Sequence, residues 1–220
     1  MSLARPRFSP ILLTALLAAG ELRGDEASAR PAGIYVTPPG GSGGTVRLHG
    51  SIPQGIKQTG MGKMMLTGML APGLGSKAGI VATLPGAKAA VRVPAGWVSV
   101  DFQLGAQPGS TAPSGMDLAS MISAASGDMM PPQAKRADEF VLVRMRTMGD
   151  AREAQVGTVG GMSGHGGPGK DAVRLVSERV GDAAFHVTPV EALPPGEYAF
   201  VFGGQGMGGG PLWDFGVDSN

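Results

Sequence analysis

The segment Trp97-Val98-Ser99-Val100-Asp101-Phe102-Gln103-Leu104 decides the fold class, because apolar and polar side chains alternate along it. Successive residues of a strand point to opposite faces of a sheet, so this alternation is typical of a strand with one buried face. The even-numbered side chains, from Val98 to Leu104, are expected to face the core. Pro94-Ala95-Gly96 stands directly before the segment and favours a turn at that point.

Short segments of the same kind lie on both sides of it, separated by turns rich in glycine and proline. On the N-terminal side they are 33–37, 45–49, 79–84 and 88–93; on the C-terminal side they are 139–148, 152–159, 172–179, 183–188, 197–202 and 212–217. The C-terminal group repeats at intervals of roughly 10–15 residues, which is typical of a sandwich or barrel rather than of alternating strands and helices. We therefore predict an all-β fold, an antiparallel β-sandwich of the immunoglobulin-like or a related type.

These segments divide the chain into two strand groups. Residues 30–104 hold the first group and 138–220 the second, and 105–137 form a Ser-, Gly- and Met-rich loop or linker between them. Within that linker, Asp117–Ala125 can form one short helix. Residues 52–76 are weakly patterned and read as weak strand or loop. Whether the two groups make one or two β subdomains stays open.

Composition excludes several classes of function. The chain has 220 residues with a net charge of +1, so it has no basic field to attract nucleic acid. It has 38 glycines and 18 prolines, yet 42% of its residues are hydrophobic, which is too apolar for general disorder. It has no cysteine, which rules out disulfides, thiolate metal sites and thiol catalysis.

The first residues have the pattern of a secretory signal peptide. Arg5 and Arg7 precede the apolar run 11–19, which is shorter than the roughly 20 residues needed to span a bilayer. Ala27-Ser28-Ala29 then provides the small residues that signal peptidase recognises. We predict that residues 1–29 are a signal peptide, with cleavage near Ala19 as the alternative, and that the protein is exported to the periplasm or beyond, without a transmembrane anchor.

Tyr198 follows Pro194-Pro195-Gly196 at the start of a predicted strand. A tyrosine in this position can bury its ring and return its hydroxyl to the backbone, as in the tyrosine corner of immunoglobulin-like sandwiches. We predict a structural role for it.

Several segments together resemble a family of exported bacterial proteins of unknown function. The resemblance is carried by Glu139–Arg144, Leu193-Pro194-Pro195-Gly196-Glu197-Tyr198, Asp214-Phe215-Gly216-Val217-Asp218, Gly33-Ile34-Tyr35 and Leu84-Pro85-Gly86-Ala87-Lys88-Ala89. It covers roughly residues 33–37, 79–104 and 138–218. It implies export and a β fold, and it implies no activity.

Three glycine-rich stretches match catalytic or nucleotide-binding motifs in spacing alone. Gly164–Lys170 has P-loop spacing, but Asp171 stands where a hydroxyl should meet magnesium, and no helix pattern follows to hold the phosphate. Ser42 lacks the strand–turn–helix context of a nucleophile elbow, and 204–210 leads into no helix. We predict loops at all three. The three histidines, which show no metal-ligand spacing, are His49, His165 and His186.

The methionines offer one specific chemistry. Met61, Met64, Met65 and Met69 have Met-x-x-Met and Met-x-x-x-Met spacing, which suits Cu(I) because thioethers are soft ligands. The competing interpretation is that they fill gaps in a Gly-rich chain, or reflect compositional drift alone. A helix would bring them to one face, but the neighbouring glycines make a helix costly, at about 1 kcal/mol each.

We therefore expect an exported, non-catalytic protein that is structural or binds a partner in the cell envelope, with no cofactor and no nucleic-acid partner. A periplasmic Cu(I)-binding protein that uses Met61, Met64, Met65 and Met69 is the alternative, and an uncharacterised hydrolase is the third hypothesis. The ligand, the partner and the oligomeric state do not follow from the sequence.

Overall fold

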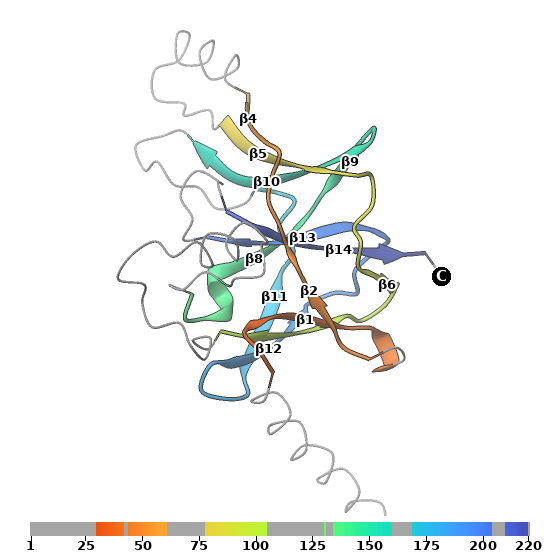
Figure 1. Ribbon diagram of the computed structural model, residues 1–220, viewed down its shortest axis with the longest axis vertical. Coiled ribbons are helices and arrows are strands. Elements are labelled where there is room, and N and C mark those ends of the chain that lie inside the picture. The colour runs from red at the N-terminus through yellow and green to blue at the C-terminus, as the bar shows by residue number, and fades with distance from the viewer. Residues whose placement is uncertain are drawn as a thin grey trace, which may run out of the picture.

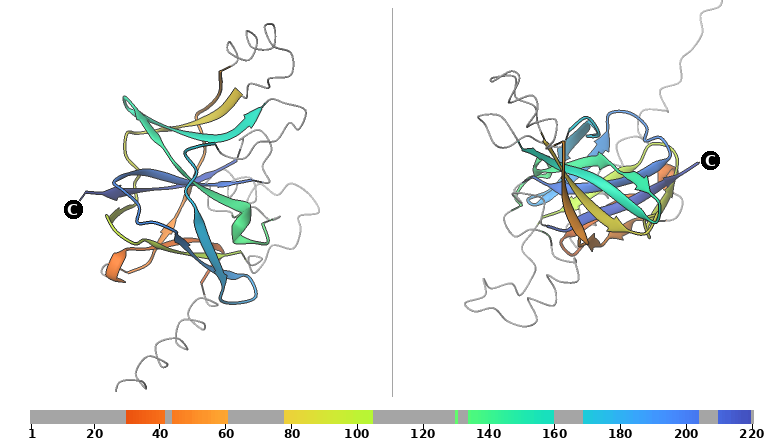
Figure 2. Two further views of the ribbon diagram at one scale, coloured as in Figure 1. Left: turned by 180° about the vertical axis from the view of Figure 1, so that it is seen from behind. Right: turned by 90° about the horizontal axis from the view of Figure 1, so that it is seen from above.

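The computed structural model describes residues 30–41, 44–60, 78–104, 130, 134–159, 169–203 and 210–219. Their strands form three sheets, which lie as a lower, a central and an upper layer in Figure 1 and are seen from two other directions in Figure 2. No helix within these ranges has the length and apolar composition needed to cross a bilayer. Short 3-10 turns lie at Pro39–Gly41, where Gly40 has a positive φ of 72°, and at Ala137–Glu139.

The lower sheet has the order β11 (Leu175–Arg179), β12 (Ala184–Pro189), β7 (Ser99–Gln103), β1 (Gly33–Thr37) and β2 (Val46–Leu48). The central sheet has the order β3 (Gly50–Ser51), β14 (Leu212–Asp218), β13 (Gly196–Phe202) and β8 (Phe140–Arg144), with β6 (Arg92–Pro94) also paired to β14. The upper sheet has the order β4 (Gly55–Thr59), β5 (Ala78–Pro85), β10 (Ala151–Val159) and β9 (Arg146–Met148). Apart from the parallel pair of β6 and β14, these strand pairs are antiparallel.

The predicted all-β, antiparallel fold is confirmed, and the alternation that decided it is seen in β7. Val98, Val100 and Phe102 are each about 1% exposed, whereas Asp101 and Gln103 face outward and are only half-buried. The even-numbered side chains therefore face the core, as the sequence predicts.

The central sheet is covered on both faces, which is why its strands are apolar almost throughout. In β13, Tyr198, Phe200 and Phe202 pack against the lower sheet, while Ala199 and Val201 pack against the upper sheet. A strand buried on both faces loses the polar alternation of a half-exposed strand. The third sheet was not predicted, because alternation within a strand does not reveal how many sheets stack.

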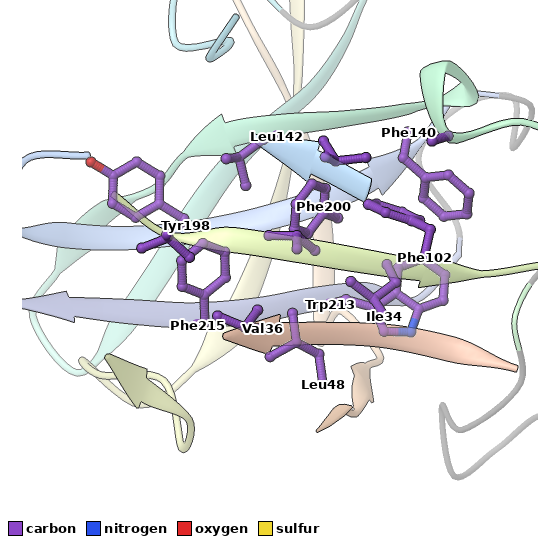
Figure 3. Close-up of a cluster of buried hydrophobic side chains, with 14 of the residues drawn as sticks. Ile34, Val36, Leu48, Phe102, Phe140, Leu142, Tyr198, Phe200, Trp213 and Phe215 are labelled. Carbon is purple, nitrogen blue, oxygen red and sulfur yellow. The ribbon is translucent and has the colours of Figure 1, made fainter. Parts of the chain in front are cut away.

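An aromatic cluster fills the space between the central and lower sheets (Figure 3). The ring of Phe200 meets that of Phe102 edge-on with centroids 5.1 Å apart, and the ring of Tyr198 stacks on that of Phe215 at 5.7 Å. Edge-to-face and offset arrangements of this kind add to the stabilisation from burial. The core between the central and upper sheets uses smaller side chains, among them Ala82, Ala154 and Ala199.

The chain passes through all three layers early and then returns (Figure 1). Residues 46–59 run from β2 in the lower sheet through β3 in the central sheet to β4 in the upper sheet. Residues 78–103 go back through β5, β6 and β7. Because β8 to β14 also supply strands to every layer, the two strand groups of the sequence are interleaved in space. The described part of the weakly patterned stretch, residues 52–60, contains the strand β4.

Candidate functional site

The tyrosine corner at Tyr198 has the geometry that the sequence predicts. The Tyr198 hydroxyl donates to the carbonyl oxygen of Pro194 at 2.7 Å, and its ring is buried in the aromatic cluster. Tyr35 makes the same bond, donating to the carbonyl oxygen of Pro31 at 2.7 Å. We did not predict this second corner, although Pro-x-Gly-x-Tyr occurs at both places in the sequence.

Burial raises the pKa of the Tyr198 hydroxyl, an effect that the nearby positive charge of Arg144 partly offsets. The pKa of Tyr35 is raised for the same reason, with Arg47 and Arg30 acting in the opposite direction. Both hydroxyls therefore stay protonated at neutral pH and remain hydrogen-bond donors.

A buried ionic network joins the central and upper sheets. The Arg152 side chain on β10 is only 5% exposed and forms an ion pair with Asp214 on β14. Asp214 also accepts from the Ser51 hydroxyl at 2.6 Å. Arg152 donates from Nε to the carbonyl oxygen of Gly86 at 2.9 Å, so the same guanidinium holds the turn after β5. Charges this deeply buried require partners of this kind.

The network continues from Glu197 to the end of β14. Glu197 accepts from the backbone N–H of Ala89 at 2.7 Å and from Arg92 Nη1 at 2.8 Å. Arg92 then donates from Nε to Asp218 at 2.7 Å, and this bond lowers the pKa of the Asp218 carboxyl. Together these contacts fix the non-repetitive turn between Pro85 and Arg92. The residues of the family resemblance, including Glu197, Asp214 and Asp218, thus have a structural use in this chain.

A cleft of about 420 Å³ opens beside β8, where the central and lower sheets meet. Residues 170–174 and 190–194 line it and are joined by a hydrogen bond from Val190 N–H to the carbonyl oxygen of Arg174, and Arg144 and Tyr198 complete its lining. The first segment runs along the edge of β8, because Val173 N–H donates to the carbonyl oxygen of Leu142 at 2.8 Å. The cleft therefore has walls of hydrogen-bonded backbone.

The lining of the cleft carries more positive than negative charge. Its cations are Arg144, Lys170 and Arg174, and its carboxylates are Asp171 and Glu191. Asp171 is already paired, since its Oδ2 lies 2.8 Å from Arg146 Nη2. Apolar side chains lie between the charges, among them Val173, Val190 and Leu193. Such a combination can hold an anion that also has an apolar part.

Among the described residues that the sequence analysis weighed for nucleotide or metal binding, only Lys170 and Asp171 line this cleft. Lys170 and Asp171, from the P-loop-like stretch, are part of the lining, but Asp171 binds Arg146 and its backbone oxygen accepts from Arg144 N–H at 2.8 Å. His186 does not line the cleft and is hydrogen-bonded to Asp101, with its Nδ1 2.7 Å from Asp101 Oδ1. His49 is exposed between β2 and β3.

The remaining predictions concern residues outside the described ranges. They include the proposed copper ligands Met61, Met64, Met65 and Met69, the signal peptide 1–29, the helix Asp117–Ala125, Ser42, His165 and most of the glycine loops 164–170 and 204–210. Among the residues that the structure describes, no group of three or more His, Cys, Asp or Glu side chains is placed to hold a metal ion.

No protein-family model, no curated protein and no solved structure matches this chain. The candidate site is therefore defined by its own geometry.

Proposed function

We propose that this chain is an exported, non-catalytic protein that binds a ligand or partner of the cell envelope in the cleft beside β8. The observation that carries the proposal is the cleft itself, which combines a volume of about 420 Å³ with apolar walls and three cationic side chains. Known ligand sites are concave, mostly apolar and supplied with a few polar groups that orient the ligand.

The surrounding structure supports a binding role because hydrogen bonds fix the segments that line the cleft. The backbone bond from Val173 N–H to the carbonyl oxygen of Leu142, 2.8 Å long, ties residues 170–174 to β8, and that from Val190 N–H to the carbonyl oxygen of Arg174, 2.9 Å long, ties residues 190–194 to residues 170–174. The tyrosine corner at Tyr198 fixes its floor. A site that is formed before the ligand arrives loses less conformational entropy on binding.

Site-specific crosslinking in living cells tests the proposal. A photoreactive benzoylphenylalanine at Ala192, which lines the cleft and is exposed, should give one adduct of defined mass. The matched control is the same residue at Thr147, an exposed position on β9 in the upper sheet. Equal adducts at both positions, or none at position 192, would argue against the cleft as the binding site.

Export is tested separately. The Ala27-Ser28-Ala29 motif predicts that the mature protein begins at Arg30, and N-terminal sequencing of protein from the periplasm or medium measures this. Recovery of the chain from the cytosol with Met1 retained would contradict export.

A further inference from the structure

We propose that the cleft beside β8 takes a small amphipathic carboxylate, with the acid group held by Arg174, Lys170 and Arg144 and the apolar part lying along Val190 and Ala192. This inference rests on the proposed function, since it names the class of ligand for the same cleft.

Lys170 and Arg174 lie on one side of the segment 170–174. Lys170, Ala172 and Arg174 are exposed, whereas Asp171 and Val173 between them are half-buried. The short side chain of Ala172 leaves space between the two positive charges. Among the described residues, neither Lys170 nor Arg174 forms an ion pair.

The third cation is held in position by the corner of β13. Arg144 Nη2 donates to the carbonyl oxygen of Pro195 at 3.0 Å, next to the Tyr198 hydroxyl. A guanidinium has five N–H donors in a planar fork, so a side chain that uses one of them for positioning retains donors for a carboxylate. Arginine binds carboxylates in this bidentate way more specifically than lysine does.

The apolar walls favour a ligand with a hydrocarbon part over a bare inorganic anion. Val190 is 40% exposed and Ala192 is also exposed, and both line the cleft, whereas Val173 and Leu193 pack into the core. An inorganic phosphate would leave the Val190 and Ala192 side chains in contact with water, whereas an alkyl or aryl group would cover them, which the hydrophobic effect favours.

Glu191 gives the proposal a directional test. It lines the same cleft, is exposed and has no ion pair among the described residues. Its negative charge opposes an anion, so Glu191→Gln should strengthen binding where removal of a cation weakens it. A site that recognises only apolar surface would keep the same affinity after Glu191→Gln and after removal of a cation.

Fluorescence titration of the full mature chain with anilinonaphthalene sulfonate, followed by displacement with sodium octanoate, measures this binding. We expect one saturable site for the dye, displaced by octanoate and not by equimolar inorganic phosphate. Phenylnaphthylamine, which has the same rings without the acid group, should bind at least about tenfold more weakly if the charge is recognised.

The double variant Lys170→Gln/Arg174→Gln should weaken octanoate binding by about tenfold or more, and Glu191→Gln should tighten it by about threefold. Lys57→Gln is the matched control, because Lys57 is an exposed cation on β4 of the upper sheet and should leave the affinity unchanged. All four substituted side chains are exposed, so the melting temperatures should stay equal and show that the variants are folded.

Equal affinities for the wild type and the double variant, or displacement of the dye by phosphate as well as by octanoate, would overturn the inference. A crosslinked adduct at Ala192 without octanoate binding would reject the carboxylate class and leave the proposed binding function in place. If neither a crosslinked adduct at Ala192 nor octanoate binding were found, both the carboxylate class and the proposed binding function would be rejected.

Discussion

Tyr35 and Tyr198 perform the same task in two different sheets. Each ring packs into the protein, and each hydroxyl returns to a proline carbonyl four residues earlier in the chain. The bond satisfies a buried donor and fixes the corner from which the strand starts. At Tyr198 this corner also positions Arg144 through Pro195, so a structural bond supports the cleft.

Replacement of Tyr198 by Phe should lower the free energy of unfolding by about 1–2 kcal/mol, because the Pro194 carbonyl loses its donor while the ring packing is retained. Tyr35→Phe should behave in the same way for Pro31. Urea denaturation of the two variants measures the change. An unchanged midpoint for Tyr198→Phe would mean that water replaces the bond without loss.

Alkaline pH should destabilise the protein through the same two residues. Burial raises both tyrosine pKa values in the folded state, so as the pH rises above about 10 the unfolded chain loses these protons first. Stability is then full below that pH and falls as the pH rises further. Denaturation midpoints should fall less steeply in Tyr35→Phe/Tyr198→Phe than in the wild type. If the midpoints fell equally steeply with pH in the double variant and the wild type, the two tyrosines would not be the cause of the alkaline destabilisation.

Arg152 links the central and upper sheets through its ion pair with Asp214. Arg152→Met leaves the buried Asp214 carboxylate without its cation and should cost about 3–5 kcal/mol in the free energy of unfolding. Arg152→Met/Asp214→Leu removes both charges and should recover much of that loss. A double variant as unstable as the single variant would show that the network stabilises through other contacts.

Among the elements, the turn from Pro85 to Arg92 has little regular structure and depends on side chains for its position. Arg152 donates to the carbonyl oxygen of Gly86, and Glu197 accepts from the backbone N–H of Ala89. Arg92 lies across β14 and donates to Glu197. β14 accommodates Arg92 because it has a glycine there: a Cβ at Gly216 would lie 2.6 Å from Arg92 Cζ. The glycine of the Asp-Phe-Gly-Val-Asp motif is thus explained by close packing.

Gly216→Ala should displace the Arg92 guanidinium and break its bonds to Glu197 and Asp218 together. We expect a loss of about 1–3 kcal/mol, the usual range for overpacking. Arg92→Met/Gly216→Ala should be no less stable than Arg92→Met alone, since the clash is then removed. A further loss in that double variant would show that the alanine disturbs β14 itself.

Single elements were predictable where the signal is local, and their partners were not. The period of β7 and the Pro-Pro-Gly corner before Tyr198 are properties of a few consecutive residues, so the burial of Phe102 and the bond of Tyr198 follow from sequence. Arg152 looks like any polar residue of an alternating strand, and only the stacking of β10 on β14 shows that it is buried against Asp214. The cleft depends on how 170–174 pairs with β8, which no local pattern encodes.

For the whole molecule, the central sheet makes the two strand groups dependent on each other. Each layer takes strands from both 30–104 and 138–220, and the central sheet contributes side chains to both cores. We expect thermal unfolding in a single transition with equal calorimetric and van't Hoff enthalpies. Backbone amides of β13 and β14 should exchange last. Two separate transitions would contradict this interdependence.

Amide NMR of the mature chain titrated with sodium octanoate tests the central claim most directly, because it reports on the scaffold and the cleft in one experiment. The account predicts shifts that saturate and are confined to residues 170–174 and 190–194 with Arg144 and Tyr198, while the amides of β4, β5 and β10 stay unchanged. Shifts centred on the upper sheet, or an unchanged spectrum at saturating octanoate, would contradict it.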